Sequence, residues 1–358
     1  MVLALAATWI GFTLYWRGRY EAEIERIRAA GHPVLPEDVV VPECPDAENM
    51  LPLLKRAKLR LESLVGGYPG RELFGLESYG GVHIGDATTD EAVRAMLEQL
   101  DPYFEMVEQA ATRPRLVMAR EDVPWCGWHL VEQLHERPAI SPEYAITDAT
   151  TLMRMAVAIE PKSASQIGVQ CDMVDAGLDL LRWALARGDP IDTSWPRLLE
   201  RIDPLDRARA ELLLERTNFV ELIESLKAGE QPHRELDSFE ARMEQRGYDP
   251  PGVLRSDDLR FLLARPLLDR WGASGLGRRT DFIEESELRG GEPWTGRDGS
   301  QGRMLRLAAQ RLEELTVARF AVAVAIAGEP PRDRGPLECV ETEDGYLIDG
   351  EWRVKTRP

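Results

Sequence analysis

The residues best suited to chemistry lie in one stretch, Trp125–Glu136, whose sequence is WCGWHLVEQLHE. It combines a thiol, two imidazoles, two carboxylates and two indoles, which are groups that bind metals, transfer protons or line ligand sites. On an α-helix, four of them share one face because they are three, three and four residues apart: Cys126, His129, Glu132 and Glu136. Two kinds of site fit this face, a metal-dependent or hydrolytic centre and a ligand-binding groove.

A metal centre is the less favoured of the two. Glu132 and His135 form an ExxH pair, but carboxylate-bridged metal bundles need two such pairs and further glutamates on other helices. The second ExxH, Glu230–His233, contains Pro232 and falls in a predicted loop. HExxH, P-loop, dinucleotide and GxSxG patterns are all missing from the sequence. We therefore expect no metal and no cofactor.

The two tryptophans favour a binding role for the same stretch. Exposed tryptophans mark binding surfaces more often than most residues do. We therefore predict a ligand groove lined by Trp125, Trp128, His129 and Glu132. The alternative is a solvated polar face beside two tryptophans that anchor the helix in a core.

The composition is that of an acidic globular protein. The 358 residues carry a net charge of −18, which repels nucleic-acid phosphates, so nucleic acid is not an expected partner. The four cysteines are far apart and form no CxxC, which disfavours a zinc ribbon or a thioredoxin-type motif: Cys44, Cys126, Cys171 and Cys339. Two disulfides remain possible in an oxidising compartment.

The first segment is predicted to be a membrane anchor. Residues 1–16 carry no charged side chain and span roughly 24 Å as a helix, and Trp16 meets Arg17 as interfacial aromatics do. We expect the membrane to be a partner through this segment, and the same helix to continue as a stalk to Gly31. The alternative is a buried helix of a soluble core. Taken literally, the arginines after the apolar run place the body in the cytoplasm.

The remainder is predicted to be mainly α-helical, with a bundle or solenoid-like body over residues 32–328. Its strongest helix follows Ser163, where apolar residues recur at intervals of four and three up to Leu185, and Gly188 ends it. Further helices are predicted over residues 46–64, 89–100, 149–159, 203–229, 236–246, 256–271, 280–289 and 304–327. Residues 329–358 alternate in polarity around two Asp-Gly dipeptides, which predicts a small β-meander packed on the body.

Several segments resemble a known family. They are EIERIRAAGHPVLPEDV, PDAENMLPLLKRA and the later MRMAVAIEP, LDLLRWALARGDP and LLERIDP. Together they resemble an uncharacterised family of membrane-anchored helical proteins of planctomycete-type bacteria. The resemblance covers most of the chain and implies a signal anchor, a helical body and a short strand-rich tail. It implies an extracytoplasmic body, and it supplies no activity and no catalytic residues.

The sequence thus predicts a membrane-tethered, non-enzymatic helical protein of the cell envelope that binds a protein or a small ligand. The alternative is an envelope hydrolase or metalloenzyme that uses the Cys126–Glu136 face.

Overall fold

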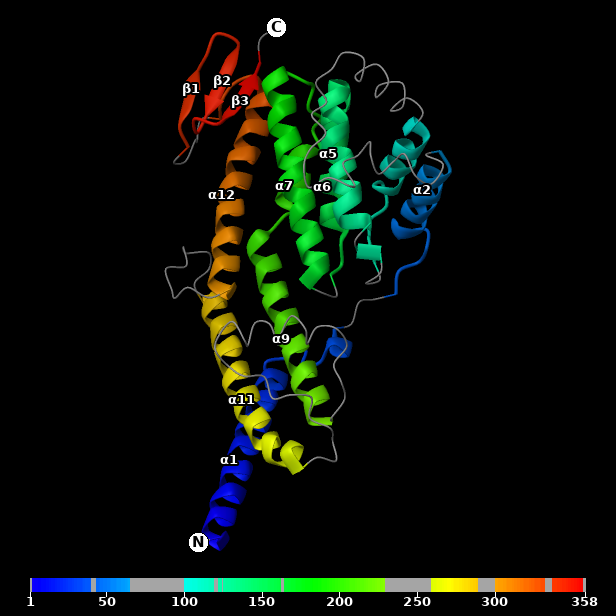
Figure 1. Cartoon of the computed structure of the whole chain (residues 1–358). Helices are drawn as coiled ribbons and strands as arrows, with labels where there is room; N and C mark the ends of the chain where they lie inside the picture. Colours follow the sequence, from blue (N-terminus) through cyan, green and yellow to red (C-terminus); the bar gives the residue numbers. More distant parts are fainter. Residues whose placement is uncertain are drawn as a thin grey trace. The chain divides into compact units, whose positions relative to one another are not determined.

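The computed structural model describes residues 2–39, 43–64, 100–118, 122–123, 125–161, 164–228, 259–288, 300–331 and 337–356. Over these residues the protein is mainly helical and has one small antiparallel sheet near its C-terminus (Figure 1). The mainly α prediction with a C-terminal meander is therefore confirmed. The chain forms two compact units, which we call unit 1 (Met1–Val40 and Ala208–Thr295) and unit 2 (Val41–Arg207 and Gly296–Pro358).

The elements of unit 1 are α1 (Val2–Ala29), η1 (Pro36–Asp38), α9 (Pro204–Ala228) from Ala208 onward, and α11 (Leu259–Leu288). The elements of unit 2 are α2 (Leu51–Leu64), a helix over residues 100–110, η3 (Trp125–His129), α5 (Leu130–Ile140), η4 (Pro142–Tyr144), α6 (Ala145–Ala158), α7 (Ala164–Arg187), α8 (Trp195–Glu200), α12 (Ser300–Ala327), β1 (Cys339–Glu341), β2 (Gly345–Ile348) and β3 (Trp352–Lys355). The predicted helices over 89–100 and 236–246 fall almost wholly outside the described residues.

The core of unit 1 forms where α1 packs along α11 and α9 supplies aromatic and aliphatic side chains. Its buried residues are Tyr20, Ile27, Val34, Phe219, Val220, Ile223, Ala273 and Leu276. Two glycines of α11 make this packing possible. A Cβ on Gly272 would lie 2.6 Å from the Tyr20 ring, and one on Gly275 would lie 2.5 Å from the Phe219 ring.

These glycines explain why α11 is one helix rather than the two predicted over 256–271 and 280–289. The glycines between those ranges weaken the local preference for helix, since each lowers helix stability by about 1 kcal/mol relative to alanine. In the structure, the same glycines allow two aromatic rings to lie against the helix backbone. Packing on α1 and α9 therefore outweighs the local preference.

A buried ion pair adds to the contact between α9 and α11 in unit 1. The Lys227 ammonium lies 2.7 Å from Asp269 and 3.1 Å from Glu224, and it sits 3.6 Å from the centroid of the Tyr20 ring. Burial raises the pKa of Tyr20 strongly, and Glu224 and Asp269 raise it further, so this ring stays neutral. One ammonium thus connects α1, α9 and α11.

The prediction of a membrane anchor is wrong. Over the described residues, no helix combines the length and the apolar character that crossing a membrane requires. The uncharged segment of α1 is short, and charged residues follow it at once from Arg17. The second half of α1 instead contributes Tyr20 and Ile27 to the core of unit 1. The anchor, transmembrane and membrane-bound localisation predictions are corrected accordingly.

Unit 2 is built around α6 and α7, whose buried apolar faces pack against each other and against α5, α8, α12 and the sheet. The predicted amphipathic pattern of α7 is confirmed, with Ile167, Val174, Leu178 and Leu181 all buried. Gly188 ends this helix with a φ of 81°, the left-handed conformation expected after its last turn. Pro52 lies in the first turn of α2, where proline is tolerated, because that helix begins at Leu51.

A buried guanidinium links four segments of unit 2. Arg137 of α5 donates from Nε and Nη2 to the two carboxylate oxygens of Asp148 on α6, at 2.8 and 2.5 Å, and from Nη2 to Glu108 at 2.9 Å. The rings of Phe104 and Tyr144 lie 4.1 and 4.0 Å from its central carbon. Burial raises the pKa of Asp148, and the adjacent Arg137 opposes that rise by stabilising the carboxylate.

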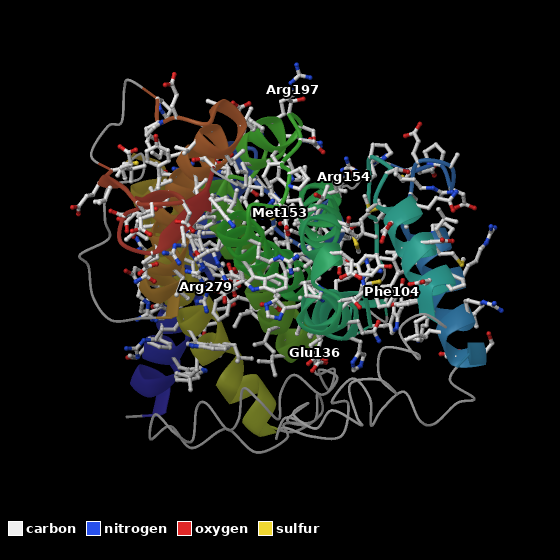
Figure 2. All side chains as sticks on the ribbon, turned by 90° about the horizontal axis from the view of Figure 1, so that it is seen from above. Phe104, Glu136, Met153, Arg154, Arg197 and Arg279 are labelled. Atoms are coloured by element: carbon white, nitrogen blue, oxygen red, sulfur yellow. The ribbon has the colours of Figure 1, made fainter. Side chains whose placement is uncertain are left out.

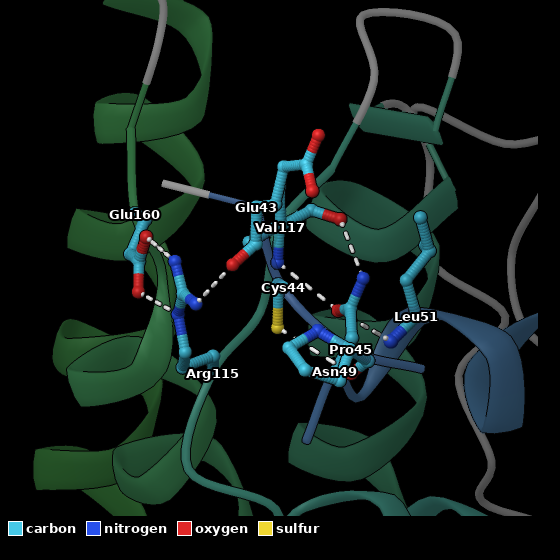
Figure 3. Close-up of polar contacts among 8 residues, drawn as sticks. All are labelled: Glu43, Cys44, Pro45, Asn49, Leu51, Arg115, Val117 and Glu160. Carbon is cyan, nitrogen blue, oxygen red and sulfur yellow. Dashed lines mark hydrogen bonds and ion pairs between the residues drawn. The ribbon is translucent and has the colours of Figure 1, made fainter. Parts of the chain in front are cut away.

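A second cluster of polar contacts, which we call the node, joins the segments around residues 49, 115 and 160 (Figure 3). The Asn49 carboxamide accepts hydrogen bonds from the amides of Leu51 and Val117, both at 3.1 Å. Arg115 binds Glu160 through two hydrogen bonds and also donates to the carbonyl of Glu43 at 3.0 Å. Short parallel bridges pair residue 49 with 115 and residue 116 with 159. The node therefore fixes the start of α2 against the end of α6.

The C-terminal meander has the strand order β1-β2-β3, with Val340 opposite Leu347 and Tyr346 opposite Val354. Asp349 and Gly350 have positive φ values of 52° and 72°, as the type I′ turn predicted from an Asp-Gly pair requires. Trp352 and Val354 of β3 are buried in the core of unit 2. The predicted packing of the meander on the helical body is thus confirmed within this unit.

We predict that Gly272→Ala destabilises unit 1 by about 1–3 kcal/mol, because the new methyl group would displace the Tyr20 ring. Urea unfolding of the full chain measures this change. Gly18→Ala is the matched control: no atom lies within 4 Å of its added methyl group, so the helix should gain about 0.5–1 kcal/mol. Equal effects of the two substitutions would contradict the packing described for α11.

We predict that Arg137→Met destabilises unit 2 by about 3–5 kcal/mol, because it leaves the Asp148 carboxylate buried without its partner. The double variant Arg137→Met/Asp148→Leu should recover most of this loss. Arg17→Met, which removes an exposed pair with Glu21, should have no measurable effect. A similar loss in the single and double Arg137 variants would show that ring packing, and not the ion pair, dominates.

Candidate functional site

The stretch singled out by sequence forms a π-helical turn, η3, followed by α5. In a π turn each amide bonds to the carbonyl five residues back, so residues three apart do not align as they do on an α-helix. The structure therefore separates the four residues expected on one face. Cys126 is directed into the core, whereas His129, Glu132 and Glu136 are partly exposed.

Cys126 is fully buried and packs in the main core of unit 2. Burial raises the pKa of its thiol to about 12, and Asp122 contributes in the same direction, while Lys55 and Lys58 oppose the rise. The thiol is therefore protonated at neutral pH. A neutral, inaccessible thiol is neither a nucleophile nor a metal ligand.

Trp125 is partly buried against the core, and the Lys58 ammonium lies 6.0 Å from the centroid of its ring. This places one face of the indole against α2. The side chain of Trp128 lies outside the described residues, so a groove lined by both indoles stays a prediction. Trp125 itself contributes packing and a cation–π contact.

The remaining residues form what we call the outer face of α5, made of His129, Glu132 and Glu136. The two carboxylates are four residues apart on one side of the helix, and both are half-buried. Burial, together with the neighbouring Glu132, raises the pKa of Glu136 to about 7. Figure 2 shows Glu136 at the margin of the helices of unit 2, whereas Met153 lies among them.

His129 stands at the junction of the π turn and α5. Its Nδ1 is buried and has no hydrogen-bond partner among the described residues. An unsatisfied buried nitrogen of this kind costs about 1–3 kcal/mol.

The inner face of α5 fixes its orientation. Gln133 is buried and accepts a hydrogen bond of 2.5 Å from the hydroxyl of Tyr103, which is itself fully buried. Arg137, one turn further on, makes the contacts with Asp148 described above. These inward contacts fix the rotation of α5, and so they also fix the positions of Glu132 and Glu136, each of which lies about 100° around the helix from its inward neighbour. Sequence reasoning missed Arg137 and Asp148, because they lie on two separate helices, α5 and α6, and their pairing depends on how those helices pack.

The described ranges contain no group of three or more His, Cys, Asp or Glu side chains arranged to hold a metal ion. The two residues of the predicted ExxH pair differ in burial, because Glu132 is half-buried and His135 is exposed. Glu136 was the last residue of the predicted face but was not among the predicted ligand-binding residues. Its pKa is nevertheless the one that is shifted on this face. Its four-residue spacing from Glu132 was the available signal.

Comparison of the chain with family models, curated proteins and solved structures finds no match. The resemblance to membrane-anchored planctomycete-type proteins therefore stays a prediction.

We predict that iodoacetamide does not modify Cys126 in the folded protein at about pH 8, because its thiol is buried and neutral. Peptide mass mapping measures this, with the partly exposed Cys44 and Cys339 as internal comparisons. All these thiols should react at similar rates once the chain is unfolded in guanidinium. Rapid native modification of Cys126 would restore it as a candidate nucleophile.

Proposed function

We propose that this protein acts by binding rather than by catalysis, and that the outer face of α5 is its binding surface. Its ligand is a cationic group, either a lysine or arginine of a partner protein or the amine of a small molecule. The observation that carries this proposal is the half-buried pair Glu132 and Glu136, one helical turn apart, with a pKa of about 7 at Glu136.

The electrostatics of the pair support a cationic ligand. Two carboxylates this close repel each other, and partial burial removes the water that would screen them. The folded state therefore holds the Glu136 proton more tightly than the unfolded chain does, so stability falls as the pH rises from about 4.5 to about 7 and stays at the lower level above it. A bound cation would remove that cost, because it favours the charged form of both groups.

The hydrolase or metalloenzyme alternative has less support. It needs Cys126 as nucleophile or ligand on the same face as His129 and Glu132. Cys126 is instead buried in the core with a neutral thiol, whereas His129 and Glu132 are partly exposed. No further observation favours a catalytic reading of this region.

A lysine-containing peptide, with a norleucine version as control, tests the proposal by calorimetry. Between pH 6 and pH 8 the affinity for the lysine peptide should rise about tenfold, because the ionised fraction of an acid with a pKa near 7 changes by about that factor. The norleucine peptide should not bind at either pH.

A double variant, Glu132→Gln/Glu136→Gln, should abolish the binding and its pH dependence. Because the whole protein is acidic, the control must remove the same charge elsewhere. Glu105→Gln/Glu200→Gln does so at two exposed glutamates of unit 2 and should bind as the unmodified chain does. Equal weakening in both double variants would mean that the peptide only senses net charge, and the proposal would then be wrong.

A further inference from the structure

The helix α2 presents a basic face although the protein as a whole is acidic. Its sequence, LPLLKRAKLRLESL, contains four basic residues and one acidic residue, whereas the chain carries a net charge of −18. Three exposed residues form a row along the helix because they are four and three residues apart: Arg56, Arg60 and Ser63. Leu59 lies beside this row and is 64% exposed. We call these four residues the basic face of α2.

The two arginines of this face are not neutralised by the part of the chain that the structure describes. Lys55, on another side of α2, pairs with Asp122 at 2.9 Å. By contrast, neither the Arg56 nor the Arg60 guanidinium makes an ion pair or a hydrogen bond to any described residue. Arginine is enriched at protein–protein interfaces, and the exposed leucine beside it offers an apolar contact that a phosphate group would not use. The basic face therefore fits an acidic surface of a protein.

The outer face of α5 matches this row in charge and in spacing. His129, Glu132 and Glu136 follow one another at intervals of three and four residues, and His129 already has helical φ and ψ values of −68° and −43°. Read from its C-terminal end, the row on α2 has the same intervals of three and four residues. Two helices placed antiparallel would therefore bring both arginines opposite both glutamates, and Ser63 opposite His129. A parallel arrangement would set an interval of three against one of four.

The side chains of both faces can form strong contacts in this register. A guanidinium binds a carboxylate through two parallel N–H···O hydrogen bonds. Glu132 and Glu136 are half-buried, so these ion pairs would be better shielded from water than a pair on an open surface. The Ser63 hydroxyl donates to the Arg60 carbonyl at 2.7 Å and can still accept a hydrogen bond from the imidazole of His129.

The two faces lie on separate helices of unit 2 (Figure 1), and no hydrogen bond or ion pair between described residues joins them within one chain. We infer, building on the function proposed above, that the cationic partner of the outer face of α5 is the basic face of α2 in a second copy of this protein. Because the two faces differ, the contact is heterologous, and copies add head to tail unless a ring closes.

Sedimentation velocity of the full chain measures this association. The net charge of −18 on each copy opposes the contact, so association is expected at protein concentrations of roughly 0.1–1 mM. The average mass should rise past that of a dimer, because every added copy leaves one open face of each kind. A chain that stays monomeric over this range while it still binds the lysine peptide would overturn the inference and leave the proposed function in place. Absence of both would count against the proposed function as well.

Two complementary variants test which faces meet. Arg56→Gln/Arg60→Gln keeps only the acidic face, and Glu132→Gln/Glu136→Gln keeps only the basic face. Each variant alone should associate at least about tenfold more weakly than the unmodified chain. An equimolar mixture should form a dimer of one copy of each and no larger species, because one intact face of each kind remains. A mixture that associates no better than either variant alone would exclude this contact.

The control removes the same positive charge elsewhere in unit 2. Arg154→Gln/Arg197→Gln does so at two exposed arginines and should associate as the unmodified chain does. Circular dichroism confirms that each variant keeps its helical content. Equal weakening in the control and in Arg56→Gln/Arg60→Gln would mean that only net charge matters, and the inference would then be wrong.

Charge swaps test the antiparallel register. Arg60→Glu/Glu132→Arg exchanges two residues that face each other in neighbouring copies, so association should persist. Arg56→Glu/Glu132→Arg instead places like charges opposite each other at both positions and should abolish association. The reverse pair of results would show a parallel contact and overturn the antiparallel arrangement.

Discussion

The buried guanidinium of Arg137 is the constraint on which the architecture of unit 2 depends. It is held by two carboxylates and two aromatic rings that come from the helix over residues 100–110, η4 and α6. A charge in this position must be fully paired, because an isolated ion in a protein interior is very costly. The rotation and height of α5 are therefore fixed on its inner side. The side of α5 that carries Glu132 and Glu136 is therefore fixed in position as well.

In unit 1, contacts of a different kind hold the helices together. Aromatic rings lie on glycines, and one lysine ammonium lies over a tyrosine ring between two helices. The close approach of Tyr20 to Gly272 buries one side of α1, whereas residues on its other side, such as Gly18, are exposed among the described residues.

Local patterns predicted much of this fold. The apolar spacing of α7, the Asp203–Pro204 start of α9 and the Asp-Gly turn of the meander each act over a few residues, and the structure confirms them. In α9 the Asp203 side chain accepts hydrogen bonds from the amides of Leu205 and Asp206, as an N-cap should. Such signals are readable because the interaction partners are close in sequence.

The predictions that were wrong concern features that depend on residues distant in sequence. The continuity of α11 depends on Tyr20 and Phe219, which are distant in sequence, and the division into two units joins residues 1–40 with residues 208–295. The orientation of Cys126 depends on a π turn that no pattern in the sequence predicts. Uncharged residues at the start of α1 suggested a membrane because hydrophobicity alone does not say whether a helix meets lipid or protein. For the candidate site, the sequence located the stretch and three partly exposed residues but not the burial that sets their charge.

The burial of β3 has a consequence for biosynthesis. Trp352 is 2% and Val354 0% exposed, and both belong to the same core as Met50 of the opening turn before α2. A ribosome must therefore translate the chain from Met50 through Val354 before this core can close. Until then, α2, α6 and α7 present apolar faces to the cell, and long-range closure of this kind is slow. Nascent chains of this protein should consequently rely on chaperones during much of their synthesis, and premature termination a few codons before Trp352 should yield a product destined for degradation.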